Sequence, residues 1–171
     1  MDHLFNIAEK VSLDTNALQQ LADLLIRVVE EGASIGFLAP VSPEEAAGYW
    51  EKVIEPGVIL LTAEQEGTIV GTVQLHPAMK RNAAHRAEIA KLMVDPGRRR
   101  QGIALQLMRA AERKAAELGR TLLILDTRAG DPSNKLYLSM GYVEAGRIPQ
   151  FARSSNGGLD DTVIYYKLLA E

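Results

Sequence analysis

The chain has 171 residues, of which 47% are hydrophobic and 24% charged, a composition typical of a soluble globular protein. Its 19 basic and 22 acidic side chains give a net charge of −3, which excludes the broad positive field that binds nucleic acid. The absence of cysteine excludes disulfides, thiolate metal sites and a cysteine nucleophile. We predict one domain over residues 1–171, in the cytoplasm, with neither a targeting segment nor a membrane-spanning segment.

The first half of the chain is predicted to hold a short opening strand, two helices and three further strands. Leucines and valines recur at helical spacing over residues 14–31, and Gly32 follows as a stop. Ser42 and Pro43 have the pattern of a helix start, so a second helix is expected to run to about Ile54. The next β-type segments are expected to form an antiparallel meander, with a turn at Glu66-Gly67: residues 57–65, 67–78 and 85–94.

The second half begins with the clearest amphipathic helix, residues 100–119, whose predicted inward side chains are Ile103, Leu107, Ala110, Ala111 and Leu118. A short apolar strand at 121–127 is expected to be buried on both faces. A helix at 132–141 and a strand pair at 142–152 and 161–169 complete the order. The fold class is therefore α/β (α+β), with one mixed, mostly antiparallel seven-stranded sheet flanked by about four helices.

The segment "KLMVDPGRRRQGIALQLM", Lys91 to Met108, has the order strand, tight loop, helix. In that geometry, free backbone N–H groups and the helix dipole converge on an anion. Gly102 lets a ligand approach the backbone closely, and Arg99 and Arg100 can add charge-assisted hydrogen bonds. The loop matches neither the P-loop nor the Gly-x-Gly-x-x-Gly pattern, and the alternative is a solvated basic patch.

The stretch "RRQGIA", Arg99 to Ala104, resembles the Gln/Arg-x-x-Gly-x-Gly/Ala signature of GNAT-type acetyltransferases. "LMVDP" precedes it, and "LLILDT" and "KLYLSMGY" follow it, at the spacing of that family. The resemblance implies the GNAT fold, with acetyl-CoA as cosubstrate and its pyrophosphate held by this loop. It implies these cofactor-binding residues: Leu92, Met93, Val94, Arg99, Arg100, Gln101, Gly102, Ile103 and Ala104. Ser133 and Lys135 are added as cofactor contacts, because they could compensate for Asp131, where the family often has asparagine.

Other segments are most similar to the tabtoxin-resistance acetyltransferase group, which acetylates small toxin-like or antibiotic-like molecules. They are "EEGASIGFLAP", "RAEIAKLMV", "LDTRAGDPSNKLY" and "TVIYYK". The resemblance therefore implies a small-molecule acceptor and a role in antibiotic or toxin resistance. It also implies that the two C-terminal strands could pair across a homodimer.

Two residues are the candidates for acid–base chemistry. Strand alternation places Glu88, Ala90 and Leu92 on one face, and in related enzymes a carboxylate on this strand acts as general base. The alternative is an exposed strand glutamate or one paired with Arg86. Tyr137 matches the family tyrosine that offers its hydroxyl to the coenzyme sulfur as general acid; the alternative is a core tyrosine with a satisfied hydroxyl.

The candidate acceptor contacts are Phe37, in a loop expected to overhang the site, together with Trp50, Gln74 and Asp126. Phe37 and Trp50 could equally be apolar residues that join helices to the sheet. His76 is an alternative base, although a surface position is the simpler interpretation. The histidine spacing predicts no metal site.

Four functions remain at this point. The first is acetyl transfer from acetyl-CoA to an amine, or a hydroxyl, of a small molecule. The second is acetylation of a protein or peptide amine, and the third is a non-catalytic acyl-CoA-binding module. The negative net charge, and the lack of an aromatic stacking surface near the arginines, argue against the fourth, nucleic-acid binding.

Overall fold

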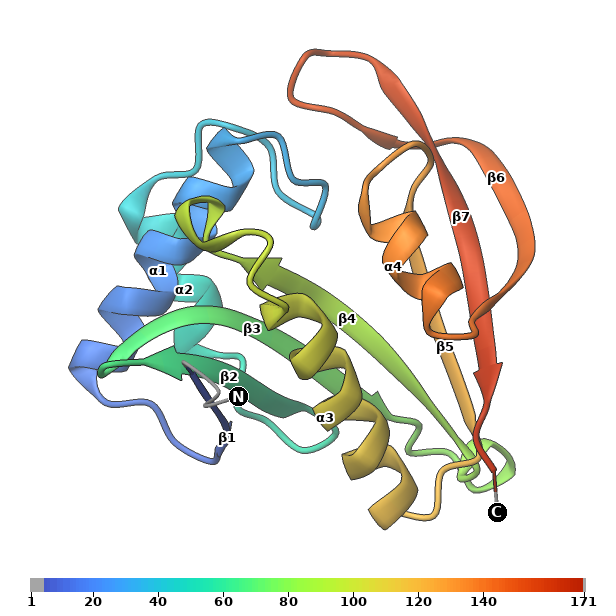
Figure 1. The fold of residues 1–171 in the computed structure, drawn as a ribbon. Helices are drawn as coiled ribbons and strands as arrows, with labels where there is room; N and C mark the ends of the chain where they lie inside the picture. The colour runs from blue at the N-terminus through green and yellow to red at the C-terminus, as the bar shows by residue number, and fades with distance from the viewer. Residues whose placement is uncertain (1–4, 171) are drawn as a thin grey trace.

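The computed structural model describes residues 5–170, which form one seven-stranded sheet in the order β1-β2-β3-β4-β5-β7-β6 (Figure 1). The strands are β1 Asn6–Lys10, β2 Ile59–Gln65, β3 Thr68–Pro77, β4 Arg86–Val94, β5 Leu122–Arg128, β6 Val143–Arg153 and β7 Leu159–Leu168. Within the described residues, β4 and β5 are parallel and every other neighbouring pair is antiparallel. This sheet and its four α-helices confirm the predicted fold class.

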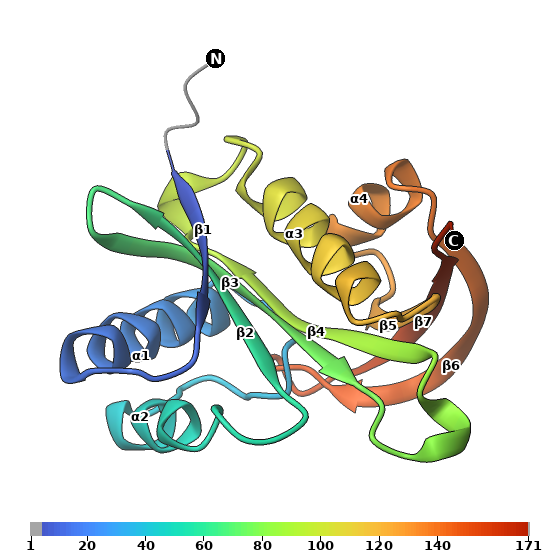
Figure 2. The same ribbon diagram turned by 90° about the horizontal axis from the view of Figure 1, so that it is seen from below.

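The helices cover both faces of the sheet. They are α1 Thr15–Glu30, α2 Pro43–Glu51, α3 Ile103–Glu117 and α4 Ser133–Ser139, and two short 3₁₀ turns lie at Arg81–Ala83 and Pro96–Arg98. Figure 2 shows α1 and α2 on one face and α3 and α4 on the other. Among the described residues, no helix has the length and apolar character to span a membrane.

Local capping explains the starts of the first two helices. The Asp14 carboxylate accepts a hydrogen bond from the Ala17 N–H at 2.7 Å, and the Ser42 hydroxyl accepts one from the Glu45 N–H at 3.0 Å. The second helix ends at Glu51 rather than near Ile54. The chain tightens there, because the Lys52 N–H donates to the Tyr49 carbonyl oxygen and the Val53 N–H to that of Trp50, three residues back instead of four.

Two hydrophobic cores lie on opposite faces of the sheet. One core joins α3 and α4 to the sheet, and the other joins α1 and α2 to β2, β3 and β4. Leu123 and Leu125 are buried, but Leu122 and Ile124 are only half-buried, because no β5 residue belongs to the second core. The expectation that this strand is buried on both faces was therefore wrong. Leu118, predicted to point inward, is 42% exposed because it lies beyond the last turn of α3.

Strand β4 has two irregularities that create space for a site. It pairs with β5 only from Arg86 to Glu88, after which the two strands diverge (Figure 1). On its other side the register against β3 shifts between Ala90 and Met93, and Lys91 has a φ of +56°. This bulge reverses the alternation, so that Leu92 packs against the same core as Ile89. The prediction that Glu88, Ala90 and Leu92 share a face was wrong beyond Ala90.

Candidate active site

A cleft lies where β4 and β5 diverge, and it encloses about 350 Å³. Residues 88–92 of β4 form one wall and residues 126–128 of β5 form the other. The loop between α1 and α2 contributes residues 33–36, while Tyr137 and residues 160–162 of β7 add further lining. Segments distant in the sequence therefore surround one space at the centre of the sheet.

The arginine loop leads from β4 into α3 and leaves the start of that helix open. Gly102 has a φ of +78°. Among residues 5–170, no side chain caps α3, and a Cβ at Gly102 would meet no atom within 4 Å. Arg99, Arg100 and Gln101 are exposed, whereas Arg98 donates a hydrogen bond to the Gln65 side chain. Two of the three arginines thus remain available to an anion at an uncapped helix N-terminus.

The predicted cofactor residues divide into those that can offer side chains and those that can offer only backbone. Met93 is 3% and Ile103 is 2% exposed, and both side chains pack in the cores, so a ligand can reach only their main chain. Leu92, Val94 and Ala104 are half-buried. Within the part of the chain that the structure describes, β4 has no strand partner on its β5 side beyond Glu88, so backbone groups there are available to bind an extended ligand. These features fit the phosphates and the pantetheine amides of acetyl-CoA.

Tyr137 is 6% exposed and lines the cleft from α4. Its ring packs against those of Tyr142 and Tyr165, each with a centroid separation of 5.9 Å. Burial raises the pKa of the Tyr137 hydroxyl above its ordinary value, and the charge of Asp131 raises it further, while a hydrogen bond with Ser133 opposes the shift. The hydroxyl therefore keeps its proton at neutral pH, as a general acid requires.

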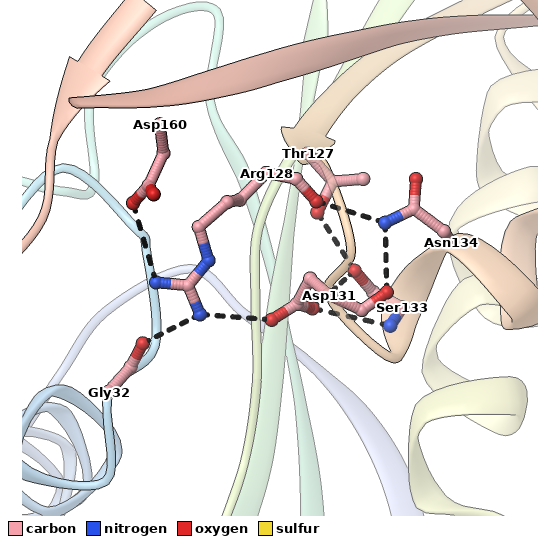
Figure 3. Close-up of polar contacts among 7 residues, drawn as sticks. All are labelled: Gly32, Thr127, Arg128, Asp131, Ser133, Asn134 and Asp160. Atoms are coloured by element: carbon pink, nitrogen blue, oxygen red, sulfur yellow. Dashed lines mark hydrogen bonds and ion pairs between the residues drawn. The ribbon is translucent and has the colours of Figure 1, made fainter. Parts of the chain in front are cut away.

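Asp131, the departure from the family pattern, is held in a polar network before α4 (Figure 3). Its Oδ2 accepts hydrogen bonds from the Ser133 backbone N–H at 3.2 Å and from the Ser133 hydroxyl at 2.6 Å. Its Oδ1 lies 3.3 Å from Nη2 of Arg128, so the carboxylate is paired. The Ser133 hydroxyl also lies 2.8 Å from Oγ1 of Thr127. Arg128 and Ser133 thus offset the negative charge, whereas Lys135 is exposed and its side chain forms no hydrogen bond or ion pair within residues 5–170.

Glu88 is an exposed residue of the cleft wall and lies opposite His76 in the β3–β4 register. Within the described chain it forms no ion pair with Arg86. Burial lowers the pKa of His76 below its ordinary value, and the charge of Glu88 opposes that shift. A neutral histidine therefore neighbours the candidate base.

Of the four predicted acceptor contacts, only Asp126 lines the cleft, and Trp50 and Gln74 are buried away from it. Trp50 is 0% exposed in the core between α1, α2 and the sheet, so its assignment to the acceptor site was wrong. The hydrophobic residues around it exclude both water and ligand. Gln74 is 2% exposed, and its side chain donates to the Tyr49 hydroxyl at 2.7 Å and lies 2.9 Å from Nε2 of His76. It supports residues near the cleft and does not line it.

The other two predictions fall at or beside the cleft. Asp126 lines it from β5 and accepts a hydrogen bond from the Thr162 hydroxyl at 2.9 Å. Phe37 follows the cleft-lining residues 33–36 and packs edge-on against Tyr49, with centroids 5.2 Å apart. Its ring lies 5.7 Å from the Lys91 ammonium.

Sequence reasoning missed the two cations of the cleft wall, Lys91 and Arg128. Burial lowers the pKa of Lys91 below its ordinary value, and the charges of Asp126 and Glu88 oppose that shift. Two signals in the sequence could have identified them. Lys91 lies between apolar residues of a central strand, and Arg128 lies at the end of an apolar strand.

Comparison with known proteins identifies the family. The model of the acetyltransferase (GNAT) family matches residues 20–142. A ribosomal-protein-alanine N-acetyltransferase from Brucella melitensis is similar in structure, with a TM-score of 0.80, 25% identity, and coverage of 96% of this chain and 99% of that one. A candidate phosphinothricin N-acetyltransferase gives a TM-score of 0.79 at 21% identity, covering 97% of this chain and 100% of that one.

The structure of yncA from Salmonella typhimurium with its cofactor acetyl-CoA gives a TM-score of 0.79 at 17% identity, covering 98% of this chain and 95% of that one. This similarity concerns the fold. In this chain, the uncapped start of α3 and the unpaired edge of β4 described above provide backbone groups that can bind acetyl-CoA. The chain belongs to the GNAT family of acetyltransferases, and its cosubstrate is acetyl-CoA.

Proposed function

We propose that the protein acetylates the amine of a small molecule. The observation that carries this proposal is the size and lining of the cleft between β4 and β5: about 350 Å³, with the carboxylates of Glu88 and Asp126 on opposite walls. That volume lies at the lower end of the range for small-molecule sites. Carboxylates at its walls suit a substrate that arrives as an ammonium ion.

Each chemical requirement of amine acetylation has a candidate in this chain. Acetyl-CoA, when bound, supplies an acetyl thioester whose sulfur leaves as a thiolate. Glu88 would take a proton from the substrate ammonium, so that the nitrogen attacks as a neutral amine. The Tyr137 hydroxyl would give a proton to the departing sulfur, and its oxygen would regain one from the nitrogen, which carries an extra proton after the attack. A backbone N–H of residues 92–94 would donate to the carbonyl oxygen as negative charge develops there.

The similar proteins support two acceptor classes. The likeness to a candidate phosphinothricin N-acetyltransferase, and the segments that resemble the tabtoxin-resistance group, favour a small toxin-like or antibiotic-like amine. The 25% identity with a ribosomal-protein-alanine N-acetyltransferase favours a peptide N-terminus as the second candidate. We rank the small molecule first because of the cleft volume.

A homodimer is a further part of this proposal. Strand β6 forms one edge of the sheet, and its neighbourhood exposes Ile148 at 42%, Phe151 at 54% and Leu159 at 47%. An apolar edge strand favours pairing with a second copy. Light scattering after size-exclusion chromatography would detect that dimer.

The test follows thiol release from acetyl-CoA over a panel of amino acids, polyamines, antibiotics and short peptides. Tyr137→Phe and Glu88→Gln should each lower kcat by about a hundredfold, the lower range for general acid–base catalysis. Tyr166→Phe and Glu117→Gln, which lie outside the cleft, are the matched controls and should retain activity. Turnover of peptides without turnover of small amines would favour the second candidate. Tight acetyl-CoA binding with no turnover on the whole panel would contradict catalysis.

A further inference from the structure

The loop between α1 and α2 reaches the cleft without regular secondary structure of its own. Residues 33–36 line the space, yet they belong to neither a helix nor a strand. Two contacts outside the cleft restrain the following residues: the Phe37 ring against Tyr49, and the Ala39 N–H, which donates to the Ser155 hydroxyl at 3.0 Å. Gly32 and Ala33 are also tied to the last turn of α1 by backbone hydrogen bonds, and Ala33 and Ile35 pack against the core between α1, α2 and the sheet. What remains to be explained is how this segment is held to the two walls of the cleft.

Lys91 supplies one such restraint from β4. Its ammonium donates a hydrogen bond of 2.6 Å to the carbonyl oxygen of Ile35. The bulge at Lys91, with its φ of +56°, turns this side chain to the face of the sheet that carries the loop. Gly36 makes room for it, because a Cβ at Gly36 would lie 2.8 Å from the Lys91 Nζ. The loop backbone and the ammonium therefore fit each other closely.

Arg128 supplies the second restraint from β5, the opposite wall (Figure 3). Its Nη2 donates to the carbonyl oxygen of Gly32 at 2.9 Å. The same nitrogen lies 3.3 Å from Oδ1 of Asp131, and Nη1 lies 3.8 Å from Oδ2 of Asp160. One guanidinium thus ties the end of α1 to the turn before α4 and to the start of β7.

The geometry points to a shared role for these two cations. We propose that Lys91 and Arg128 are positioning residues, which hold residues 32–36 over the cleft and thereby set how tightly the acceptor binds. A cation from each diverging strand donates to a carbonyl of the same loop, so the loop spans the opening between them. The effect on the acceptor rests on the proposed function, whereas the effect on the loop does not.

The loop position can be measured without any substrate. Chymotrypsin cleaves after phenylalanine, so the rate of cleavage between Phe37 and Leu38, followed by mass spectrometry, reports opening of the loop. Loss of one charge-assisted hydrogen bond should raise that rate by about tenfold in Lys91→Met or Arg128→Met. Gly36→Ala should act like Lys91→Met because the new Cβ displaces the ammonium. Lys114→Met, which removes the surface ion pair with Glu9, is the control and should leave the rate unchanged.

The acceptor role is measured by kinetics with an amine that the wild type acetylates. KM for the amine should rise about tenfold in Lys91→Met, while the dissociation constant of acetyl-CoA changes by less than about twofold. Arg128→Met is best made in the Asp131→Asn background, so that no unpaired carboxylate remains beside Tyr137. Arg128→Lys, which keeps the charge, should recover part of the lost affinity.

The outcomes separate this inference from the proposed function. The positioning role would be overturned if the Lys91 and Arg128 variants were cleaved after Phe37 at the wild-type rate. It would also be overturned if faster cleavage accompanied a lower urea midpoint of unfolding. Faster cleavage with unchanged KM for the amine would overturn the effect on the acceptor. If the wild type acetylates no member of the panel, the proposed function fails together with that effect, and the cleavage rates still decide the position of the loop.

Discussion

Gly71→Ala tests how closely α3 packs on the sheet beneath the start of its first turn. Gly71 lies in β3 opposite Val94. A Cβ built on Gly71 would lie 3.0 Å from Cγ2 of Ile103, 3.0 Å from the Met93 carbonyl oxygen and 3.1 Å from Cδ1 of Leu107. Two of these atoms are side-chain carbons of α3 residues and the third is a backbone oxygen of β4, so an added methyl group fits only if these tightly packed neighbours shift by a few tenths of an ångström.

We expect Gly71→Ala to lower the free energy of unfolding by about 1–3 kcal/mol, the usual cost of an added methyl group in a tightly packed core. Ile103 is the first residue of α3, so relief of the clash displaces the helix start beside Arg99 and Arg100. Acetyl-CoA binding should therefore weaken several-fold even in the folded variant.

Urea unfolding measures the first effect, and calorimetric titration with acetyl-CoA measures the second. Gly48→Ala is the matched control, because Gly48 lies within α2 and a Cβ there would meet no atom within 4 Å. That control should gain about 0.5–1 kcal/mol from helix propensity. If Gly71→Ala unfolds at the wild-type urea concentration and binds acetyl-CoA normally, the packing of α3 does not position its N-terminus as we infer.

Three further perturbations address the site. Replacing both Arg99 and Arg100 by glutamine should weaken acetyl-CoA binding at least about tenfold and reduce the salt dependence of that binding, which titration at two ionic strengths checks. The free energy of unfolding should not change, because both side chains are exposed. In Asp131→Asn, loss of the charge that raises the pKa of Tyr137 should lower that pKa, so the alkaline limb of kcat/KM should move to lower pH. An unchanged limb would contradict Tyr137 as the titrating acid. Trp50→Ala should cost about 3–5 kcal/mol of stability while KM for the acceptor stays constant, and a raised KM would return Trp50 to the acceptor site.

The order of elements was predictable because its signals are local. The helix starts at Asp14 and Ser42 depend on side chains that cap backbone groups three residues away. The turn at Glu66-Gly67 likewise depends on two adjacent residues with positive φ, 50° and 78°. Such interactions are encoded in neighbouring letters of the chain.

The faces of β4 were not predictable in the same way. Strict alternation predicts Lys91 on the face opposite Glu88. The bulge adds one residue against β3 and turns the Lys91 side chain toward the loop between α1 and α2. The sequence "EIAKLMV" does not distinguish a bulged strand from a regular one, because the bulge arises from pairing with β3.

The sequence by itself determined the order of elements and the arginine loop before α3, and the resemblance of "KLYLSMGY" to the family singled out Tyr137 as a candidate, because each depends on spacing within one segment. Only the tertiary structure decided that Trp50 is core, that Gln74 is buried and does not line the cleft, and that Lys91 and Arg128 face the same loop. The contact from Arg128 to Gly32 joins residues 96 positions apart. Its existence depends on where β4 and β5 separate, and that separation is a property of the assembled sheet.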